Sequence, residues 1–348
     1  MVKVFINGYG NIGRRIATAF SQDKEIQFIG VGKYSVDDRV KDAVDRNFPL
    51  YVPANMVSKF KEKGFPVSGN ISNAIMESDI VIDAAKDGYG YDNKVNLYEP
   101  LNKAAIFQGG EDNTGDKKVA DVIHNSRVNY KDMFKKKYVI QGSCNVSGMG
   151  RILQPMIEKY GSEIERYDVT LIRRSADLED LKEVKDSIEW DKNPHHQDDV
   201  KSFLPTVNLY VEAYKVPSRM MHLHQMTVRF KSAAPDKESF LDTYKREFGV
   251  AILSNARGTG DIRKKAIDLG FEHGDTNMVH IHSDTIRTQD DTLKLLYSDD
   301  QTGMVIPENY LLFQSMLYGR SARDAYRRTD AIFHIDKKRK TLEEEFKA

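Results

Sequence analysis

The stretch VKVFINGYGNIG, residues 2–13, decides the fold of the chain. Residues 2–6 form a short run rich in β-branched and aromatic side chains, which predicts a buried strand. Over residues 12–20, apolar side chains recur every three or four positions, which predicts a helix. The glycines between these two elements stand in the order G-x-G-x-x-G, so the chain is expected to open with a strand, a tight turn and a helix.

This turn has the chemistry of a dinucleotide-binding site. Gly8 allows the tight turn, Gly10 lets the backbone approach a pyrophosphate, and Gly13 lets the helix pack closely on the strand. The amides around Asn11 and Ile12 lie at the N-terminus of the predicted helix, where they can bind the phosphates. The alternative is a glycine-rich turn without a ligand, which the strand–turn–helix context disfavours.

The pattern of strands predicts two domains. Residues 26–31, 79–84, 104–107 and 138–141 read as further buried strands that alternate with helices, which predicts a Rossmann-type, doubly wound parallel sheet. After residue 143 the pattern changes.

Residues 146–160 read as an amphipathic helix, and the stretches 167–172, 209–216 and 226–230 alternate with period two. That pattern predicts an α+β catalytic domain with a mixed or antiparallel sheet, within an α/β fold overall. A long helix is expected over residues 305–327, followed from residue 337 by a charged tail or a solvated final helix.

Composition excludes several classes of function. The 348 residues carry 52 basic and 52 acidic side chains, so no net charge favours nucleic acid or an anionic membrane. No apolar run reaches the roughly 20 residues that span a bilayer. A single cysteine excludes an internal disulfide and no pairs of metal ligands stand out, so we expect a cytoplasmic protein without a metal site.

The end of the second strand favours NADP over NAD. NAD enzymes usually place an acidic residue there to bind the ribose hydroxyls, but this chain has Gly32-Lys33-Tyr34-Ser35. Lys33 would attract a 2′-phosphate and Ser35 could donate to it. The alternative is that Lys33 is an ordinary surface lysine, since Asp37 and Asp38 follow closely. Residues 108–110 (QGG) close another strand, where Gly110 would meet a ligand.

Cys144 lies between a predicted strand and a predicted helix. At or just before a helix N-terminus, the helix dipole would stabilise a thiolate and lower the pKa of the thiol. The neighbouring amides, including that of Asn145, could stabilise an oxyanion. The alternative is a buried cysteine that acts as a small hydrophobic residue.

A thiolate and a nicotinamide together define a reaction class. The thiolate adds to an aldehyde to form a hemithioacetal, hydride leaves to the nicotinamide, and a thioester remains for water or phosphate to attack. A base must remove a proton, and histidine is the usual type. Candidates are His195 and His196, in a loop expected after Pro194, and His222 and His224, whose i, i+2 spacing places both on one face of a strand.

Arg173 and Arg174 end the strand predicted over 167–172, where adjacent side chains point to opposite faces. One of them can therefore face a ligand, and the guanidinium fork suits a phosphate. For the histidine pairs, a surface-facing or structural role is the alternative.

The chain resembles the archaeal-type (type II) phosphorylating glyceraldehyde-3-phosphate dehydrogenases over nearly its whole length. The stretches that carry the resemblance are VFINGYGNIGRRIA, QGGE, SCNVSGMGRIL, LIRRSAD, PHHQDDV, MHLHQMTV and MVIPEN. It implies oxidation of D-glyceraldehyde 3-phosphate with inorganic phosphate and with NADP, preferred, or NAD, in glycolysis or gluconeogenesis. It also implies a homotetramer in which the last helix returns to the first domain, so that the Rossmann-type domain comprises residues 1–142 and 308–348 and the catalytic domain 143–307.

The resemblance also implies roles for individual residues. Cys144 is the nucleophile, and the acid/base histidine is His222 or His224, with His222 favoured. The cofactor contacts it implies are Asn11, Ile12, Gly110, Arg174 and Gln301. The substrate contacts it implies are Ser143, Asn145, His195 and His196, the histidine pair close to a phosphate.

This chain departs from the family at two places. Val146 and Ser147 stand where two threonines are usual, which weakens an inorganic-phosphate contact or leaves it to Ser147. Gln197 stands where a glycine is common. Two other functions stay open: a related enzyme such as an aspartate-semialdehyde dehydrogenase, and a non-catalytic NADP-binding regulator.

Overall fold

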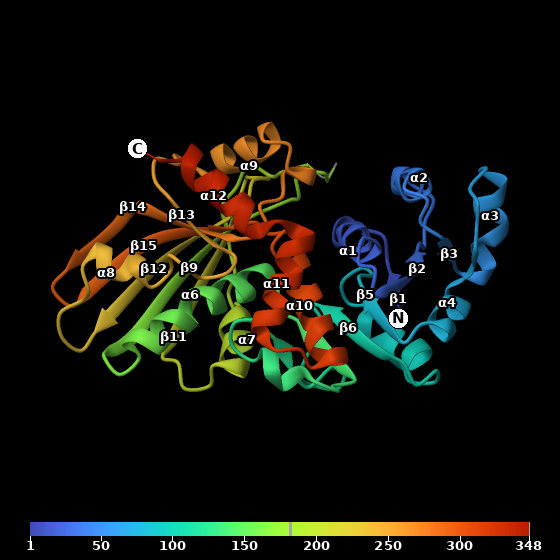
Figure 1. Cartoon of the computed structure of the whole chain (residues 1–348), viewed down its shortest axis with the longest axis horizontal. Coiled ribbons are helices and arrows are strands. Elements are labelled where there is room, and N and C mark those ends of the chain that lie inside the picture. The colour runs from blue at the N-terminus through green and yellow to red at the C-terminus, as the bar shows by residue number, and fades with distance from the viewer. Residues whose placement is uncertain (181–182, 348) are drawn as a thin grey trace. The chain divides into compact units, whose positions relative to one another are not determined.

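The computed structural model describes residues 1–180 and 183–347, which form two compact units (Figure 1). Unit 1 contains Met1–His124, Tyr130–Ser143 and Glu308–Ala325. Unit 2 contains Asn125–Asn129, Cys144–Pro307 and the chain from Tyr326 onward. Each unit is therefore assembled from three separate stretches of sequence.

Unit 1 is built on a sheet of eight strands in the order β4-β3-β2-β1-β5-β6-β8-β7, all parallel. The predicted doubly wound parallel sheet is confirmed, and its strand order reverses between β1 and β5. The strands are β1 (Val2–Asn7), β2 (Ile26–Gly32), β3 (Leu50–Val52), β4 (Gly69–Asn70), β5 (Ile80–Asp83), β6 (Ala104–Gln108), β7 (Ile123–His124) and β8 (Tyr138–Gln141).

The helices of unit 1 follow the strands of its sheet. They include α1 (Asn11–Ser21), α2 (Asp38–Asp45), α3 (Val57–Glu62), α4 (Ile71–Glu77) and α5 (Gly90–Asn93). Helix α1 contacts β1 and β2, and α4 contacts β1, β2 and β3. Phe20 of α1 packs edge-on against Tyr310 and Phe313, with ring centroids 5.4 and 5.1 Å away. The late segment from Glu308 therefore supplies part of the core of this unit.

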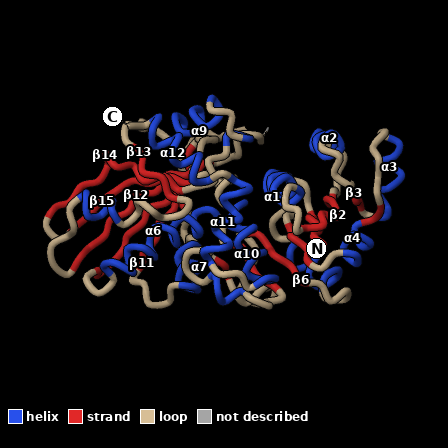
Figure 2. The backbone as a smooth tube through the Cα atoms, viewed as in Figure 1, coloured by secondary structure: helices blue, strands red, loops and turns tan. Residues whose placement is uncertain are grey.

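Unit 2 contains a mixed sheet of seven strands in the order β10-β11-β9-β12-β15-β14-β13, and a mixed or antiparallel sheet is what the sequence predicts for this part of the chain. Figure 2 draws its strands in red and labels β11 to β15 among them. Pairs β11–β9 and β13–β14 are parallel, and the other neighbours are antiparallel. The strands are β9 (Ile164–Arg174), β10 (Glu189–Trp190), β11 (Leu209–Val216), β12 (His222–Phe230), β13 (Val250–Leu253), β14 (Val279–Gln289) and β15 (Thr292–Asp299).

Four helices of unit 2 pack on or beside this sheet. Helix α6 contacts β9 and β15, α7 contacts β11, α8 contacts β14, and α12 contacts β13. The helices of this part of the chain are α6 (Cys144–Tyr160), α7 (His196–Phe203), α8 (Lys237–Asp242), α9 (Thr259–Asp268) and α12 (Ile335–Glu345).

The C-terminal quarter differs from its sequence-based expectation in two respects. The helix expected over residues 305–327 is divided into α10 (Val305–Tyr318) and α11 (Ala322–Phe333), because Gly319 adopts a positive φ of 55° that ends the first helix. The expected first domain included all of residues 308–348, but the chain from Tyr326 onward groups with unit 2. The physical reason is α12, the final helix that the sequence offered as the alternative to a charged tail, which packs on β13.

Among the described residues, no helix is long and apolar enough to cross a membrane.

Candidate functional site

A cavity of about 760 Å³ opens at the carboxyl edge of the parallel sheet of unit 1. It is lined by the loops that follow β1, β2, β5 and β6, and it includes the point where the strand order reverses. In open parallel sheets, ligands bind at this topological switch point. The cavity therefore has the place and the size expected for a dinucleotide.

The glycine turn after β1 has the geometry that its sequence predicts. Gly8 adopts a φ of 116°, and a Cβ there would lie 2.3 Å from the carbonyl oxygen of Ala84. A Cβ on Gly13 would lie 2.0 Å from the carbonyl oxygen of Gly8, so only glycine lets α1 pack this closely on the turn. A Cβ on Gly10 would meet nothing nearer than a guanidinium nitrogen of Arg39 at 3.7 Å. This side of the turn is thus open for a pyrophosphate.

Most of the residues predicted to bind the cofactor meet at this cavity. Its lining includes Gly8, Gly10, Asn11, Ile12 and Lys33. Two more predicted residues lie next to it: Gly13 packs beneath the turn, and Gly110, with a φ of 115°, stands between two lining residues. Arg174 and Gln301 belong to unit 2 and do not line this cavity.

The charges beside β2 are arranged differently from the expectation. Lys33 is buried, and its ammonium forms an ion pair with Asp37 at 2.5 Å. Ser35 donates to the same carboxylate at 2.9 Å. Arg39, from α2, also lines the cavity and donates to the side-chain oxygen of Asn11 at 2.6 Å. The described residues include no carboxylate paired with Arg39, so its charge faces the cavity uncompensated.

A buried polar network that the sequence did not reveal supports the cavity floor. Asp83, the last residue of β5, accepts hydrogen bonds from the Tyr98 hydroxyl at 2.5 Å and from Asn93 at 2.9 Å. Asn7 donates to Tyr98 at 2.6 Å and accepts from the Tyr34 hydroxyl at 2.8 Å. A carboxylate at the end of a central parallel strand was the available signal, and it could have marked Asp83 as a site residue.

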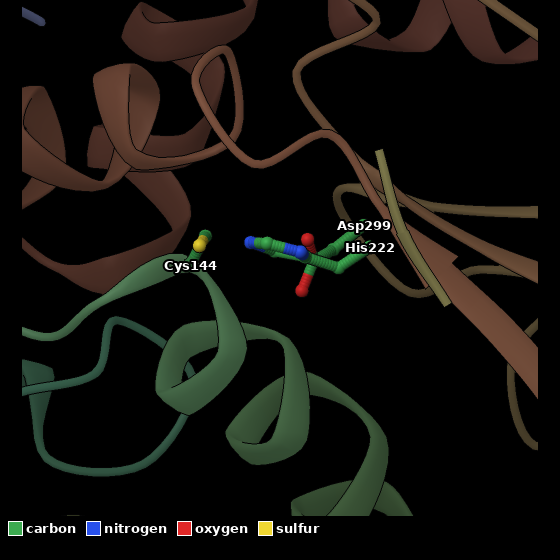
Figure 3. Close-up of side chains that lie close together, drawn as sticks. All are labelled: Cys144, His222 and Asp299. Carbon is green, nitrogen blue, oxygen red and sulfur yellow. The ribbon is translucent and has the colours of Figure 1, made fainter. Parts of the chain in front are cut away.

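In unit 2, three reactive side chains point toward one another from different elements (Figure 3). Cys144 is the first residue of α6, as predicted, His222 is the first residue of β12, and Asp299 is the last residue of β15. The sulfur of Cys144, a ring nitrogen of His222 and a carboxylate oxygen of Asp299 all lie within 4.8 Å of one another. The pairing of β12 with β15 sets His222 opposite Asp299.

The pKa of Cys144 is raised, not lowered as its place at a helix N-terminus suggested. Burial raises the pKa of the thiol most, and the nearby carboxyl of Asp299 raises it further. Arg174 and the backbone amide of Asn145 act in the opposite direction but do not offset burial. The resting cysteine is therefore a thiol, and any nucleophilic role of its sulfur would require the loss of this proton.

His222 has a fixed proton position. Its Nδ1 accepts a hydrogen bond at 3.1 Å from the backbone N–H of Arg174, which can only donate. Burial, together with Arg174, lowers the pKa of His222 well below its ordinary value, so the ring is neutral. A neutral imidazole with an accepting Nδ1 carries its proton on Nε2.

His224 and His196 belong to a second network that Asn145 bridges. The Nε2 of His224 donates to the side-chain oxygen of Asn145 at 3.0 Å, and the Asn145 amide nitrogen lies 3.4 Å from Nε2 of His196. Burial lowers the pKa of His224 to about 3 and that of His196 to about 2. Both rings are neutral and orient Asn145, the residue that follows the cysteine.

The histidine pair expected in a loop instead begins a helix. His195 caps α7 and His196 is its first residue, and the two rings stack with centroids 4.2 Å apart. His195 is exposed, and its Nδ1 bonds Asp199 at 2.7 Å, which raises the pKa of the ring. Arg173, the neighbouring cation, forms an ion pair with Asp191 at 3.0 Å.

The other predicted residues are placed less directly. Arg174 forms an ion pair with Asp177 and lowers the pKa of Cys144. Gln301 is buried, and its side-chain oxygen has no hydrogen-bond partner among the residues described. Ser143 is the last residue of its stretch of unit 1 and directly precedes the cysteine.

A Rossmann-type unit with an open dinucleotide turn is typical of nicotinamide-dependent dehydrogenases. A second unit with a cysteine–histidine pair at the start of a helix is the kind of site found in those members of this class that act through a thiol. No family model matches the chain. It is 33% identical over 344 residues to a glyceraldehyde-3-phosphate dehydrogenase of Picrophilus torridus, covering 96% of this chain and 97% of that protein. For proteins of the same name the identities are 32% over 341 residues in Saccharolobus solfataricus (96% and 98% covered) and 34% over 319 residues in Pyrobaculum neutrophilum (89% and 90%). The chain belongs to the glyceraldehyde-3-phosphate dehydrogenase family.

Proposed function

We propose that this protein oxidises D-glyceraldehyde 3-phosphate to 1,3-bisphosphoglycerate, with inorganic phosphate and NADP, and that it also catalyses the reverse reaction. The observation that carries the proposal is the position of Cys144 at the start of α6, with a ring nitrogen of His222 within 4.8 Å of its sulfur. Membership of the glyceraldehyde-3-phosphate dehydrogenase family argues against the two other functions that the sequence leaves open, a semialdehyde dehydrogenase and a non-catalytic regulator.

The first chemical step takes place on Cys144. Its sulfur adds to the aldehyde carbon, and the thiol proton leaves the sulfur as the hemithioacetal forms. The amides at the start of α6 can stabilise the developing oxyanion, because the first N–H groups of a helix have no partner within the helix. His222 is the histidine that faces the reacting sulfur, so its Nε2–H can donate to the substrate oxygen. His224 acts through Asn145 as a positioning residue.

The nicotinamide, when bound, accepts the hydride that leaves the hemithioacetal carbon. Gly8, Gly10, Asn11 and Ile12 would hold its pyrophosphate at the turn after β1. Cys144 then carries a thioester. An oxygen of inorganic phosphate attacks its carbonyl carbon, and the sulfur leaves with the electron pair of the carbon–sulfur bond. We place the anionic groups of substrate and phosphate near His195 and Arg173, the cations at the start of α7 and the end of β9. Val146 and Ser147 are both fully buried, which makes them poor candidates for a phosphate contact.

We assign the preference for NADP to Lys33 and Arg39 together. Both cations line the cavity of unit 1, and no acidic residue stands at the end of β2, where NAD enzymes usually place one. Lys33 is partly neutralised by Asp37, so the larger share of the 2′-phosphate binding falls to Arg39. The proposed setting is a reducing cytoplasm and the proposed assembly is a homotetramer, which light scattering after gel filtration would test.

The test of the function is NADP⁺ reduction with D-glyceraldehyde 3-phosphate, with and without inorganic phosphate, for the natural protein and Cys144→Ser. We expect phosphate-dependent reduction that the substitution abolishes. Steady turnover without phosphate would contradict the phosphorylating reaction. Full activity of Cys144→Ser would contradict the thiol mechanism.

A further inference from the structure

Asp37 holds the two polar groups that the end of β2 offers to a 2′-phosphate. Its Oδ2 accepts from the Lys33 ammonium at 2.5 Å and from the Ser35 hydroxyl at 2.9 Å. Lys33 and Ser35 both line the cavity of unit 1, whereas Asp37 is not among the lining residues. A carboxylate outside the cavity therefore binds donors that belong to its wall.

The surroundings of Asp37 are those of a bound anion. Its Oδ1 accepts from the backbone amide of Arg39 at 3.1 Å, in the first turn of α2. An ammonium, a hydroxyl and a backbone N–H at a helix start are also the groups with which proteins bind phosphates. Burial raises the pKa of Asp37, but the donors around the carboxylate outweigh burial and hold the pKa below its ordinary value. The carboxylate is therefore ionised at neutral pH, and it supplies the negative charge that a phosphate would otherwise bring.

The two partners of this ion pair differ in what they need from it. The Lys33 side chain is only 9% exposed, and a buried ammonium without a counter-charge is costly. The Asp37 side chain is 44% exposed, so its carboxylate can turn to solvent at little cost. A 2′-phosphate can thus replace the carboxylate beside Lys33 without leaving a buried charge unpaired.

Arg39 is the second cation of this cavity and provides a comparison. Its guanidinium donates to the side-chain oxygen of Asn11, a neutral acceptor, and pairs with no carboxylate in the described part of the chain. A phosphate that reaches Arg39 displaces no negative charge. A phosphate that reaches Lys33 has to compete with Asp37.

We propose that Asp37 sets the ratio of NADP to NAD binding, because it competes with the 2′-phosphate for Lys33 and Ser35. The proposal rests on the proposed function, which assigns NADP to this cavity. NAD has a hydroxyl in place of the phosphate, so the ion pair stays closed when NAD binds. When NADP binds, the ammonium, with its three donors, turns to the phosphate or is shared with the carboxylate, and Ser35 has a single proton that Asp37 must release. Asp37 therefore weakens the binding of NADP and not that of NAD.

The first experiment measures by calorimetry how tightly the apo-protein binds 2′,5′-ADP and 5′-AMP, which differ only in the 2′-phosphate. Asp37→Asn removes the charge and keeps a side-chain oxygen that can cap α2. We expect this variant to bind 2′,5′-ADP about 10-fold more tightly, since a regained bond to a charged group is worth at least this factor. Its affinity for 5′-AMP should stay unchanged.

Asp38→Asn is the matched control. Asp38 is the exposed first residue of α2, so the variant loses the same charge one position away without releasing Lys33. Because exposed charges are screened by salt, both affinities should stay within about twofold of the natural values.

The second experiment tests whether Asp37 acts through Lys33. In a Lys33→Met background, Asp37→Asn should lose most of its effect on 2′,5′-ADP binding, because no ammonium is left to release. Urea unfolding gives a readout that is independent of the calorimetry. Asp37→Asn should be less stable than the natural protein without ligand, and 2′,5′-ADP should stabilise it more than it stabilises the natural protein.

Unchanged or weaker binding of 2′,5′-ADP by Asp37→Asn would overturn the proposal, since Asp37 would then orient Lys33 toward the phosphate. An equal gain in Asp38→Asn would also overturn it, because the effect would be one of overall charge. So would an undiminished gain in the Lys33→Met background. Failure of the natural protein to reduce NADP⁺ would instead sink the proposed function, and the two nucleotides would still report on Asp37.

Discussion

The backbone N–H of Arg174 donates to Nδ1 of His222 at 3.1 Å, and this single bond fixes what the histidine can do. The donor belongs to the end of β9, and β9 pairs with β12 along most of its length. The ring is therefore oriented by the main chain, and replacing the Arg174 side chain would leave the bond in place. A neutral histidine held in this way carries its proton on Nε2.

Cofactor selectivity should depend on Arg39 more than on Lys33. Arg39→Ala removes a charged donor that has no carboxylate partner in the described part of the chain. A bond to a charged group is worth about 1.5–3 kcal/mol, so NADPH affinity should fall roughly 10- to 100-fold. Lys33→Asp should also weaken NADPH binding, and NADH binding should change little in either variant. Fluorescence titration of both cofactors measures this. Lys41→Ala, on the exposed side of α2, the helix that carries Arg39, is the control. An equal loss of affinity for NADPH and NADH would contradict the assignment.

Gly148→Ala should disturb the site without touching substrate. The added methyl would meet an oxygen of Asp299 at 3.2 Å, closer than comfortable contact, and would push the carboxyl away from the start of α6. We expect kcat to fall while KM for the aldehyde stays within about threefold, since the residues that we propose for the substrate phosphate, His195 and Arg173, are not the ones that the methyl would meet. Unfolding by urea should show that the variant remains folded. A fall confined to KM would mean that Gly148 contacts substrate instead.

Asp300 and Asp299 should differ sharply in their effect on stability. Asp300→Asn weakens the buried ion pair with Arg263, and breaking such a pair costs about 3–5 kcal/mol of unfolding free energy. Asp299→Asn should change the free energy of unfolding by less than about 1 kcal/mol, since no hydrogen bond is lost. Denaturant unfolding of the two variants, side by side, measures the difference. Similar losses would show that Asp299 has a structural partner.

As the pH is lowered, the free energy of unfolding should begin to fall at a higher pH than the protonation of carboxylates alone would cause. Burial lowers the pKa of His280 to about 3 and that of His282 to about 4, and His222, His224 and His196 are lowered as well. Each folded pKa lies below the unfolded value near 6.5, so the unfolded chain binds more protons below that pH. The stabilisation is complete above pH 6.5 and is lost as the pH falls toward the folded values.

Urea midpoints between pH 7.5 and 5 measure this decline. Each neutral, buried histidine should contribute about 1.4 kcal/mol per pH unit at most. His282→Gln removes one of them and should make the decline shallower. A midpoint that stays constant down to pH 5 would contradict burial of these rings in neutral form.

Binding of the phosphorylated aldehyde should weaken at alkaline pH. Asp199 raises the pKa of His195, so the ring keeps its positive charge further toward neutral pH than an isolated histidine. As the pH rises through that pKa the charge is lost, and KM for the substrate should increase. Asp199→Asn should move this increase to lower pH, and His195→Gln should abolish it. A pH-independent KM in the natural protein would exclude His195 from phosphate binding.

Local patterns account for most of what the sequence predicts correctly. The strand, turn and helix of residues 2–20 and the cysteine at the start of α6 depend on neighbours within a few positions, and glycine or helix periodicity reveals them. Gly319 is a comparable local signal for the break between α10 and α11. Asp299 could not be found in this way. Its meaning depends on the β12–β15 pairing that sets it opposite His222, and on the absence of a partner of the kind that its neighbour Asp300 has.

Arg39 was missed for a similar reason. It lies on a helix whose sequence looks solvated, and only the fold brings its guanidinium to Asn11. Lys33 was identified, but its pairing with Asp37 depends on a loop geometry that residue order leaves undetermined. Long-range contacts of this kind decide which of several charged side chains lacks an oppositely charged partner and can bind a charged ligand.

The stretch Glu308–Ala325 has a consequence for how the protein is made. Tyr310 bonds Asp23, Asn309 bonds Gln108 at 2.9 Å, and Phe313 packs on Phe20, so the first unit takes part of its interior from near the end of the chain. During synthesis, the nucleotide-binding turn leaves the ribosome long before the residues that complete its own core. The nascent protein must keep an unfinished, partly apolar sheet from aggregating until residues 308–325 have been made, and a fragment released before that point lacks part of the core of its first unit.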